Sequence, residues 1–98
     1  MSDLFRLDER TIIITGASRG IGAAVARTVA AQGGSTVLVA RSREPLEALA
    51  AELPCPSTVV VGDVADTQVV DEAISAGERL GNLWGLVNNA GIQPAYQP

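Results

Sequence analysis

The chain has 98 residues, of which 47% are hydrophobic and 18% charged, a composition that indicates one small globular domain with an apolar core. Its net charge of −4 argues against a nucleic-acid partner, because binding phosphates requires a basic surface. All seven cations are arginines, so no lysine or histidine is present as a general base or metal ligand, and we expect no metal site.

Nothing in the sequence predicts export or membrane insertion. No apolar run approaches the ~20 residues of a membrane span, since Arg27 interrupts the longest candidate. The segment from Met1 to Arg6 carries charges where a signal peptide would be apolar. Cys55 is the single cysteine, which suits a reducing compartment. We therefore expect a cytoplasmic protein without a membrane partner.

Four short runs rich in β-branched residues predict four strands. They span Thr11–Thr15, Thr36–Ala40, Thr58–Val61 and Leu83–Val87. Their apolar residues are continuous rather than alternating, as expected for strands buried on both faces of a parallel sheet.

Stripes of apolar residues at helical spacing lie between the predicted strands. The stripes consist of Ile21, Val25 and Val29, of Leu46, Leu49 and Leu53, and of Val70 and Ile74. The first helix should end at Gly33-Gly34, the second should begin after Ser42 as N-cap, and the third should run from Asp66 to about Gly81.

The alternation β-α-β-α-β-α-β predicts the α/β class and a doubly wound, Rossmann-like parallel sheet, here truncated to four strands in the order 3-2-1-4. Right-handed crossovers would place the first two helices on one face and the third on the other. Residues 1–98 form one partial domain in this interpretation, with residues 92–98 as a loop tail. The strand at Leu83–Val87 would lie at an edge and favour self-association, with Trp84 exposed.

A glycine-rich loop, Thr-Gly-Ala-Ser-Arg-Gly-Ile-Gly at residues 15–22, follows the first strand directly. A glycine at the strand end permits a tight turn, and the later glycines let a pyrophosphate approach the backbone. The free N–H groups and positive dipole of the helix start favour an anion. Three glycines could form an ordinary turn, but phosphate binding requires this strand–loop–helix context.

The loop resembles the T-G-x-x-x-G-x-G motif of short-chain dehydrogenases/reductases. Asn88-Asn89-Ala90-Gly91 resembles their N-N-A-G motif, and Asp63-Val64 the pair with which they hold adenine. The resemblance implies the dinucleotide-binding part of an oxidoreductase that transfers hydride between its cofactor and a carbonyl or alcohol. The cofactor-binding residues it implies are Gly16, Ser18, Arg19, Gly20, Ile21, Gly22, Arg41, Ser42, Asp63, Val64, Asn89, Ala90 and Gly91.

The resemblance also assigns individual roles at the strand ends. Asn89 would lie beside the cofactor ribose, while Asn88 and Thr15 would tie neighbouring strands together. Asp63 would accept a hydrogen bond from the adenine amino group, although it could instead only end a strand and precede a helix cap.

The end of the second strand bears on the choice between NADP and NAD. By resemblance, Ala40 occupies the position of the Asp that selects NAD in this family, and Arg41 follows it. An Asp there would repel a 2′-phosphate, whereas an Arg binds one through a planar, charge-assisted fork. Arg19 offers a second cation, although either arginine could be a solvated surface charge. We expect NADP rather than NAD.

The family's catalytic Ser and Tyr-x-x-x-Lys lie downstream of the N-N-A-G motif. The sequence has no Lys, and Tyr96 is its single tyrosine. We therefore expect no catalytic residue and no activity in these 98 residues, and a small carbonyl or alcohol substrate only in a longer form.

The alternative is a non-catalytic nucleotide-binding module or inactive fragment. A P-loop NTPase would need a Lys after the glycines, and a methyltransferase is not excluded by fold alone.

Overall fold

The computed structural model describes residues 7–18 and 20–89. Its strands are β1 (Thr11–Thr15), β2 (Ser35–Ala40), β3 (Ser57–Val61) and β4 (Leu83–Asn88). Its helices are α1 (Gly20–Ala31), α2 (Arg43–Glu52) and α3 (Thr67–Leu80). The elements alternate in the predicted order, and each predicted strand is confirmed to within one residue at either end.

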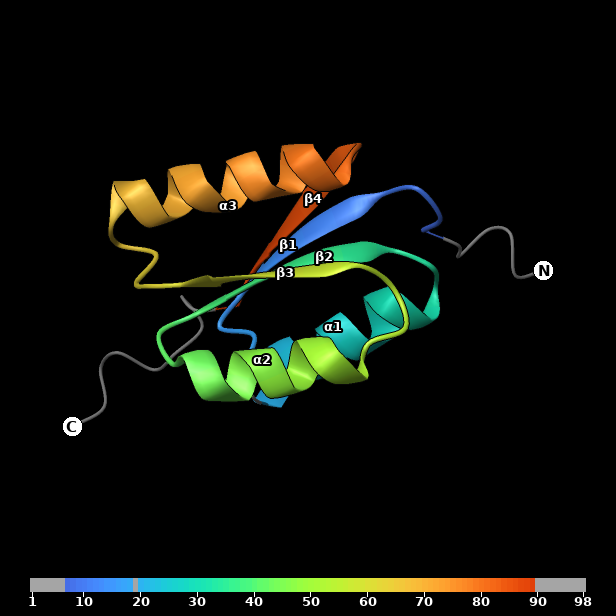
Figure 1. Ribbon diagram of the computed structural model, residues 1–98, viewed down its shortest axis with the longest axis horizontal. Coiled ribbons are helices and arrows are strands. Elements are labelled where there is room, and N and C mark those ends of the chain that lie inside the picture. Colours follow the sequence, from blue (N-terminus) through green and yellow to red (C-terminus); the bar gives the residue numbers. More distant parts are fainter. Residues whose placement is uncertain (1–6, 19, 90–98) are drawn as a thin grey trace.

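The strands form one parallel sheet in the order β3-β2-β1-β4, which confirms the predicted topology. Figure 1 shows α3 on one face of the sheet and α1 with α2 on the other, as right-handed crossovers require. Because all four strands run in the same direction, their carboxyl ends meet at one edge. Ligands bind at that edge in sheets of this kind.

The core consists of two apolar layers separated by the sheet. Alternate residues of β1 point to opposite faces, so Ile12 and Ile14 pack with α1 and α2 while Ile13 packs with α3. The central strands β1 and β2 are buried almost throughout, as their continuous apolar runs predict. Leu46 of α2 completes the first layer and Val69 of α3 the second.

The buried faces of α1 and α3 differ from the predicted stripes. Ile21 is 64% exposed, and the buried residues of α1 are Gly22, Ala23, Ala26, Val29 and Ala30. Val70 and Ile74 are 39% and 40% exposed, and the buried face of α3 is Val69, Ala73, Ala76 and Gly77. The physical reason is that small side chains let a helix lie close to the sheet, so Ala and Gly mark the contact better than the larger residues do.

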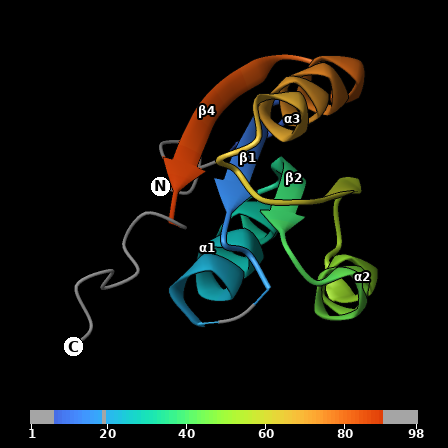
Figure 2. The same ribbon diagram turned by 90° about the vertical axis from the view of Figure 1, so that its left-hand side faces the viewer.

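β4 also departs from the expectation of burial on both faces. Its side chains alternate between partly buried and exposed, with Trp84 at 59% and Leu86 at 62% exposure. Among the described strands it lies at the outer edge of the sheet (Figure 2). The guanidinium of Arg10 lies 4.8 Å from the ring centroid of Trp84. The predicted exposure of Trp84 is confirmed.

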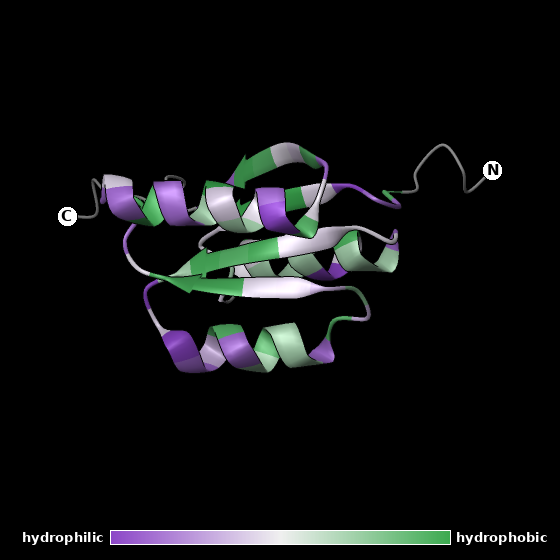
Figure 3. Ribbon diagram, turned by 45° about the horizontal axis from the view of Figure 1, so that its top comes forward, coloured by the Kyte–Doolittle hydropathy of each residue, from purple (hydrophilic) through white to green (hydrophobic). Residues whose placement is uncertain are grey.

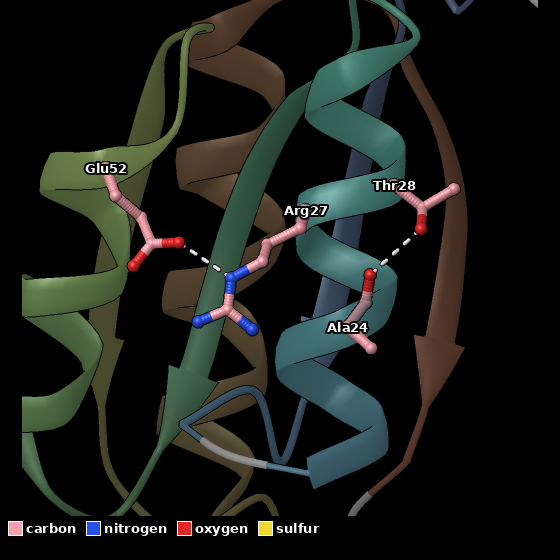
Figure 4. Close-up of polar contacts among 4 residues, drawn as sticks. All are labelled: Ala24, Arg27, Thr28 and Glu52. Carbon is pink, nitrogen blue, oxygen red and sulfur yellow. Dashed lines mark hydrogen bonds and ion pairs between the residues drawn. The ribbon is translucent and has the colours of Figure 1, made fainter.

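Polar interactions define the helix ends and link two helices. The carboxylate of Asp66 caps α3 by accepting a hydrogen bond from the Gln68 amide, as predicted. On the other face, Arg27 of α1 donates to the carboxylate of Glu52 at the end of α2, with 2.7 Å between Nε and Oε2 (Figure 4). The hydrophilic residues, in purple, lie on the helices and connections, whereas the strands are white to green (Figure 3). No helix in the described part of the chain is long and apolar enough to cross a membrane.

Candidate functional site

A cavity of about 400 Å³ lies where the carboxyl ends of the strands meet. It is lined by Gly16, Ser18, Val39, Ala40, Arg41, Ser42, Gly62, Asp63, Val64 and Asn89. These residues follow or end β1, β2, β3 and β4 in turn. The parallel sheet therefore brings together four segments that lie as many as 73 residues apart, the separation of Gly16 and Asn89.

The glycine loop occupies one wall of this cavity. Gly16 has a φ of 62°, a left-handed conformation that glycine adopts without steric cost. Gly22 is buried in the first turn of α1, where a Cβ would collide with the carbonyl oxygen of Gly16. Glycine at these positions thus lets α1 begin directly against the loop that lines the cavity.

The end of β4 is joined to the end of β1 by side-chain hydrogen bonds. The Thr15 hydroxyl lies 3.0 Å from Oδ1 of Asn88, which confirms the predicted tie between the two strands. The next residue, Asn89, donates from Nδ2 to the carbonyl oxygen of Gly16 over 3.1 Å. The first half of the N-N-A-G segment is therefore in direct contact with the glycine loop.

Arg41 and Ser42 form the wall contributed by the β2–α2 connection. Arg43, two residues on, pairs with Glu47 on the exposed side of α2, whereas Arg41 lines the cavity. Ser42 is the N-cap of α2, as predicted, but its side chain makes no capping hydrogen bond. Ser42 thus lines the cavity at the N-terminus of α2, next to Arg41 in the chain, and its hydroxyl is not used in capping.

Asp63 and Val64 follow β3 and close the cavity on the side of that strand. One carboxylate oxygen of Asp63, Oδ1, accepts a hydrogen bond from the Ala65 amide over 2.9 Å. Its backbone carbonyl accepts one from the Asp66 amide, so Asp63 does shape the turn before α3. Asp63 also lines the cavity, so its structural role and a binding role are compatible.

Most of the residues expected at the site are found around one cavity. Gly16, Ser18, Arg41, Ser42, Asp63, Val64 and Asn89 line it. Gly20, Ile21 and Gly22 form the first turn of α1, and Arg19, Ala90 and Gly91 lie outside the described residues. The sequence interpretation missed Gly62, where a Cβ would collide with Val69; its signal was a glycine between a strand and the acidic residue at its end.

Residues 10–97 match the family model of the short chain dehydrogenases. The chain is 44% identical over 89 residues to a sulfoacetaldehyde reductase from Chromohalobacter salexigens, an alignment that covers 88% of this chain and 35% of the reductase. Fold, site and sequence thus agree, and the chain belongs to the short-chain dehydrogenase/reductase family. It corresponds to the amino-terminal, nucleotide-binding part of that fold.

Solved structures show the same similarity in three dimensions. A dehydrogenase/reductase from Sinorhizobium meliloti superposes with a TM-score of 0.84 at 32% identity, covering 91% of this chain and 37% of that one. A 3-oxoacyl (acyl-carrier-protein) reductase from Agrobacterium tumefaciens with NADP bound gives a TM-score of 0.78 at 27% identity, covering 91% and 36%. The chain spans a little over a third of the length of these relatives.

Proposed function

We propose that the chain is the NADP(H)-binding portion of an oxidoreductase that acts on a carbonyl or alcohol. The observation that carries this proposal is the cavity at the carboxyl edge of the sheet, which is lined by the glycine loop, Arg41 and Asp63 together. A bound nicotinamide dinucleotide would supply the hydride chemistry. The residues described here would bind and orient it.

The pyrophosphate fits the wall formed by the glycine loop and the start of α1. Close approach of a phosphate to the backbone requires positions without side chains, and two such positions are Gly16, which lines the cavity, and Gly20, where a Cβ would meet only open space. The free N–H groups and the positive end of the α1 dipole stabilise negative charge there. This cradle needs no lysine, in contrast to a P-loop.

The 2′-phosphate of NADP fits the wall formed by Arg41 and Ser42. A guanidinium and a hydroxyl not used in capping can donate hydrogen bonds to a phosphate, and the N-terminus of α2 adds its dipole. Ala40, which also lines the cavity, adds no negative charge to repel it. The related Agrobacterium reductase was solved with NADP bound, which supports NADP as the cofactor.

The adenine fits beside Asp63 and Val64. The carboxylate oxygen of Asp63 that does not bind Ala65 can accept a hydrogen bond from the adenine amino group, and Val64 offers an apolar surface for the ring. Asn89, which contacts Gly16 and also lines the cavity, would lie beside the second half of the dinucleotide, as the family resemblance implies. By resemblance Ala90 and Gly91 would extend this side of the site.

Exchange of the residues that face the 2′-phosphate tests the proposal. Replacing Ala40 with Asp and Arg41 with Gln removes a cation and adds an anion, and preference should shift from NADPH towards NADH. Loss of one charge-assisted hydrogen bond costs about 1.5–3 kcal/mol, so NADPH affinity should fall by at least about tenfold. Calorimetric titration of both cofactors measures the change. An unaltered preference in the double variant would mean that Arg41 does not contact the cofactor.

A further inference from the structure

The peptide unit that joins Gly16 to Ala17, just after β1, is hydrogen-bonded at both its C=O and its N–H to residues in or next to the two neighbouring strands. Its carbonyl oxygen, on Gly16, accepts a hydrogen bond from Nδ2 of Asn89 over 3.1 Å. Its N–H, on Ala17, donates to the carbonyl oxygen of Val39 over 3.2 Å. Asn89 follows β4 and Val39 lies in β2, the two strands that flank β1 in the sheet. One peptide plane of the loop is thus fixed from both sides.

This fixed peptide determines the path of the glycine loop. Gly16 lies in the left-handed region, where the chain turns away from β1 towards α1. The first turn of α1 lies very close to the same carbonyl oxygen. A Cβ on Gly22 would collide with this oxygen and would also lie 2.9 Å from Nδ2 of Asn89. The loop, the helix start and the end of β4 therefore converge on the Gly16 carbonyl oxygen.

We propose that Asn89 is a positioning residue, whose side-chain amide holds the Gly16–Ala17 peptide and so preorganises the glycine loop for a pyrophosphate. This inference rests on the proposed function, since it concerns the same cavity. A positioning role for Asn89 and a direct contact between Asn89 and the cofactor ribose predict different effects on ligand binding. A positioning role affects every ligand with a pyrophosphate, including one that lacks the second ribose.

Titration with ADP separates the two roles, because ADP has the pyrophosphate and adenine but neither the second ribose nor nicotinamide. The variants are Asn89→Leu, of similar size and uncharged, and Asn89→Ala. Asn88→Ala is the matched control, because it removes the adjacent hydrogen bond to Thr15 and leaves the Gly16 carbonyl untouched. We expect both Asn89 variants to bind ADP about three- to tenfold more weakly than wild type, as for loss of one hydrogen bond, and the control to match wild type.

Amide hydrogen exchange in the ligand-free chain tests the positioning without any cofactor. The Ala17 amide should exchange faster in both Asn89 variants than in Asn88→Ala, while the Leu38 amide in the centre of the sheet keeps its wild-type rate and shows that the fold is intact. Unchanged Ala17 exchange in folded Asn89 variants would overturn the inference. So would normal ADP affinity with weakened NADPH affinity, which would indicate a ribose contact. If wild type bound neither nucleotide, the proposed function would fail, and the exchange rates would still decide the role of Asn89.

Discussion

At the scale of single residues, the sequence identified most of the site because its residues directly follow predicted strands. Gly16, Asp63 and Asn89 each come at or just after a strand end, and parallel strands bring such ends to one edge. The contact between Asn89 and Gly16 could not be predicted, because it depends on the register of β1 against β4, which shifts between Thr11 and Ile12. Gly62 carried a local signal, but the reason for its glycine, the Val69 side chain of α3 that a Cβ would strike, is evident only once α3 packs on the sheet.

Gly22 provides a residue-scale prediction. In Gly22→Ala the new methyl group would collide with the Gly16 carbonyl, so the glycine loop must move and NADPH affinity should fall by about tenfold or more, in line with overpacking costs of about 1–3 kcal/mol. Gly85→Ala is the control, since its Cβ would lie at an ordinary 3.4 Å from Ile12 Cδ1. Calorimetric titration of both variants measures the effect. Full affinity in a folded Gly22→Ala protein would show that the loop is not the phosphate site.

At the scale of elements, order and bounds were predictable because each strand is a compact β-branched run and each helix has start and stop residues. The buried faces of α1 and α3 were not, because the periodicity of large apolar residues selected Ile21 and Ile74, which are exposed, whereas Leu46 and Leu49 of α2 are buried as their stripe predicts. Close packing on a sheet favours Ala and Gly, which carry little hydrophobic signal. For β4, a composition typical of an interior strand indicated burial on both faces, whereas the predicted position at an edge correctly indicated that Trp84 is exposed.

The link between α1 and α2 gives a prediction about pH. The hydrogen bond from Arg27 holds the pKa of Glu52 below its ordinary value of 4.5. A carboxylate whose pKa is lowered by folding stabilises the native state above its unfolded-state pKa, and this contribution is lost as the pH falls through its folded-state pKa. Glu52→Gln should therefore be slightly less stable than wild type at neutral pH, with a gap that closes in acid.

The gap between Glu52→Gln and wild type should be small and should shrink with added salt, because both side chains are exposed to solvent. Urea denaturation at neutral and acidic pH, at low and high ionic strength, measures it. A gap that widened on acidification would contradict the assignment of the lowered pKa to Glu52.

At the scale of the whole molecule, the edge strand β4 exposes apolar side chains. Trp84 and Leu86 of β4 are more than half exposed, and a groove of about 200 Å³ beside Leu86 is lined by Val70 and Ile74 of α3. Edge strands without charges or prolines tend to pair with other chains. The 98-residue chain should consequently self-associate and be only marginally stable, as small domains with a limited buried area are.

Sedimentation equilibrium over a range of concentrations measures this self-association. Leu86→Lys places a charge on β4, a device that natural edge strands use against pairing, and should shift the chain towards monomer. The same substitution should leave NADPH affinity intact, because Leu86 does not line the cofactor cavity. A strictly monomeric wild type with a sharp, cooperative melt would contradict the prediction.

The central claim is that the cavity at the carboxyl edge of the sheet binds NADP(H), and titration of the wild-type chain with NADPH and NADH tests it most directly. We predict saturable binding of both, with NADPH at least about tenfold tighter, as one charge-assisted contact from Arg41 to the 2′-phosphate requires. The difference should diminish at high salt, since the contact is electrostatic. Equal affinities or a preference for NADH would contradict the assignment of Arg41, and absence of binding by either cofactor would contradict the claim itself.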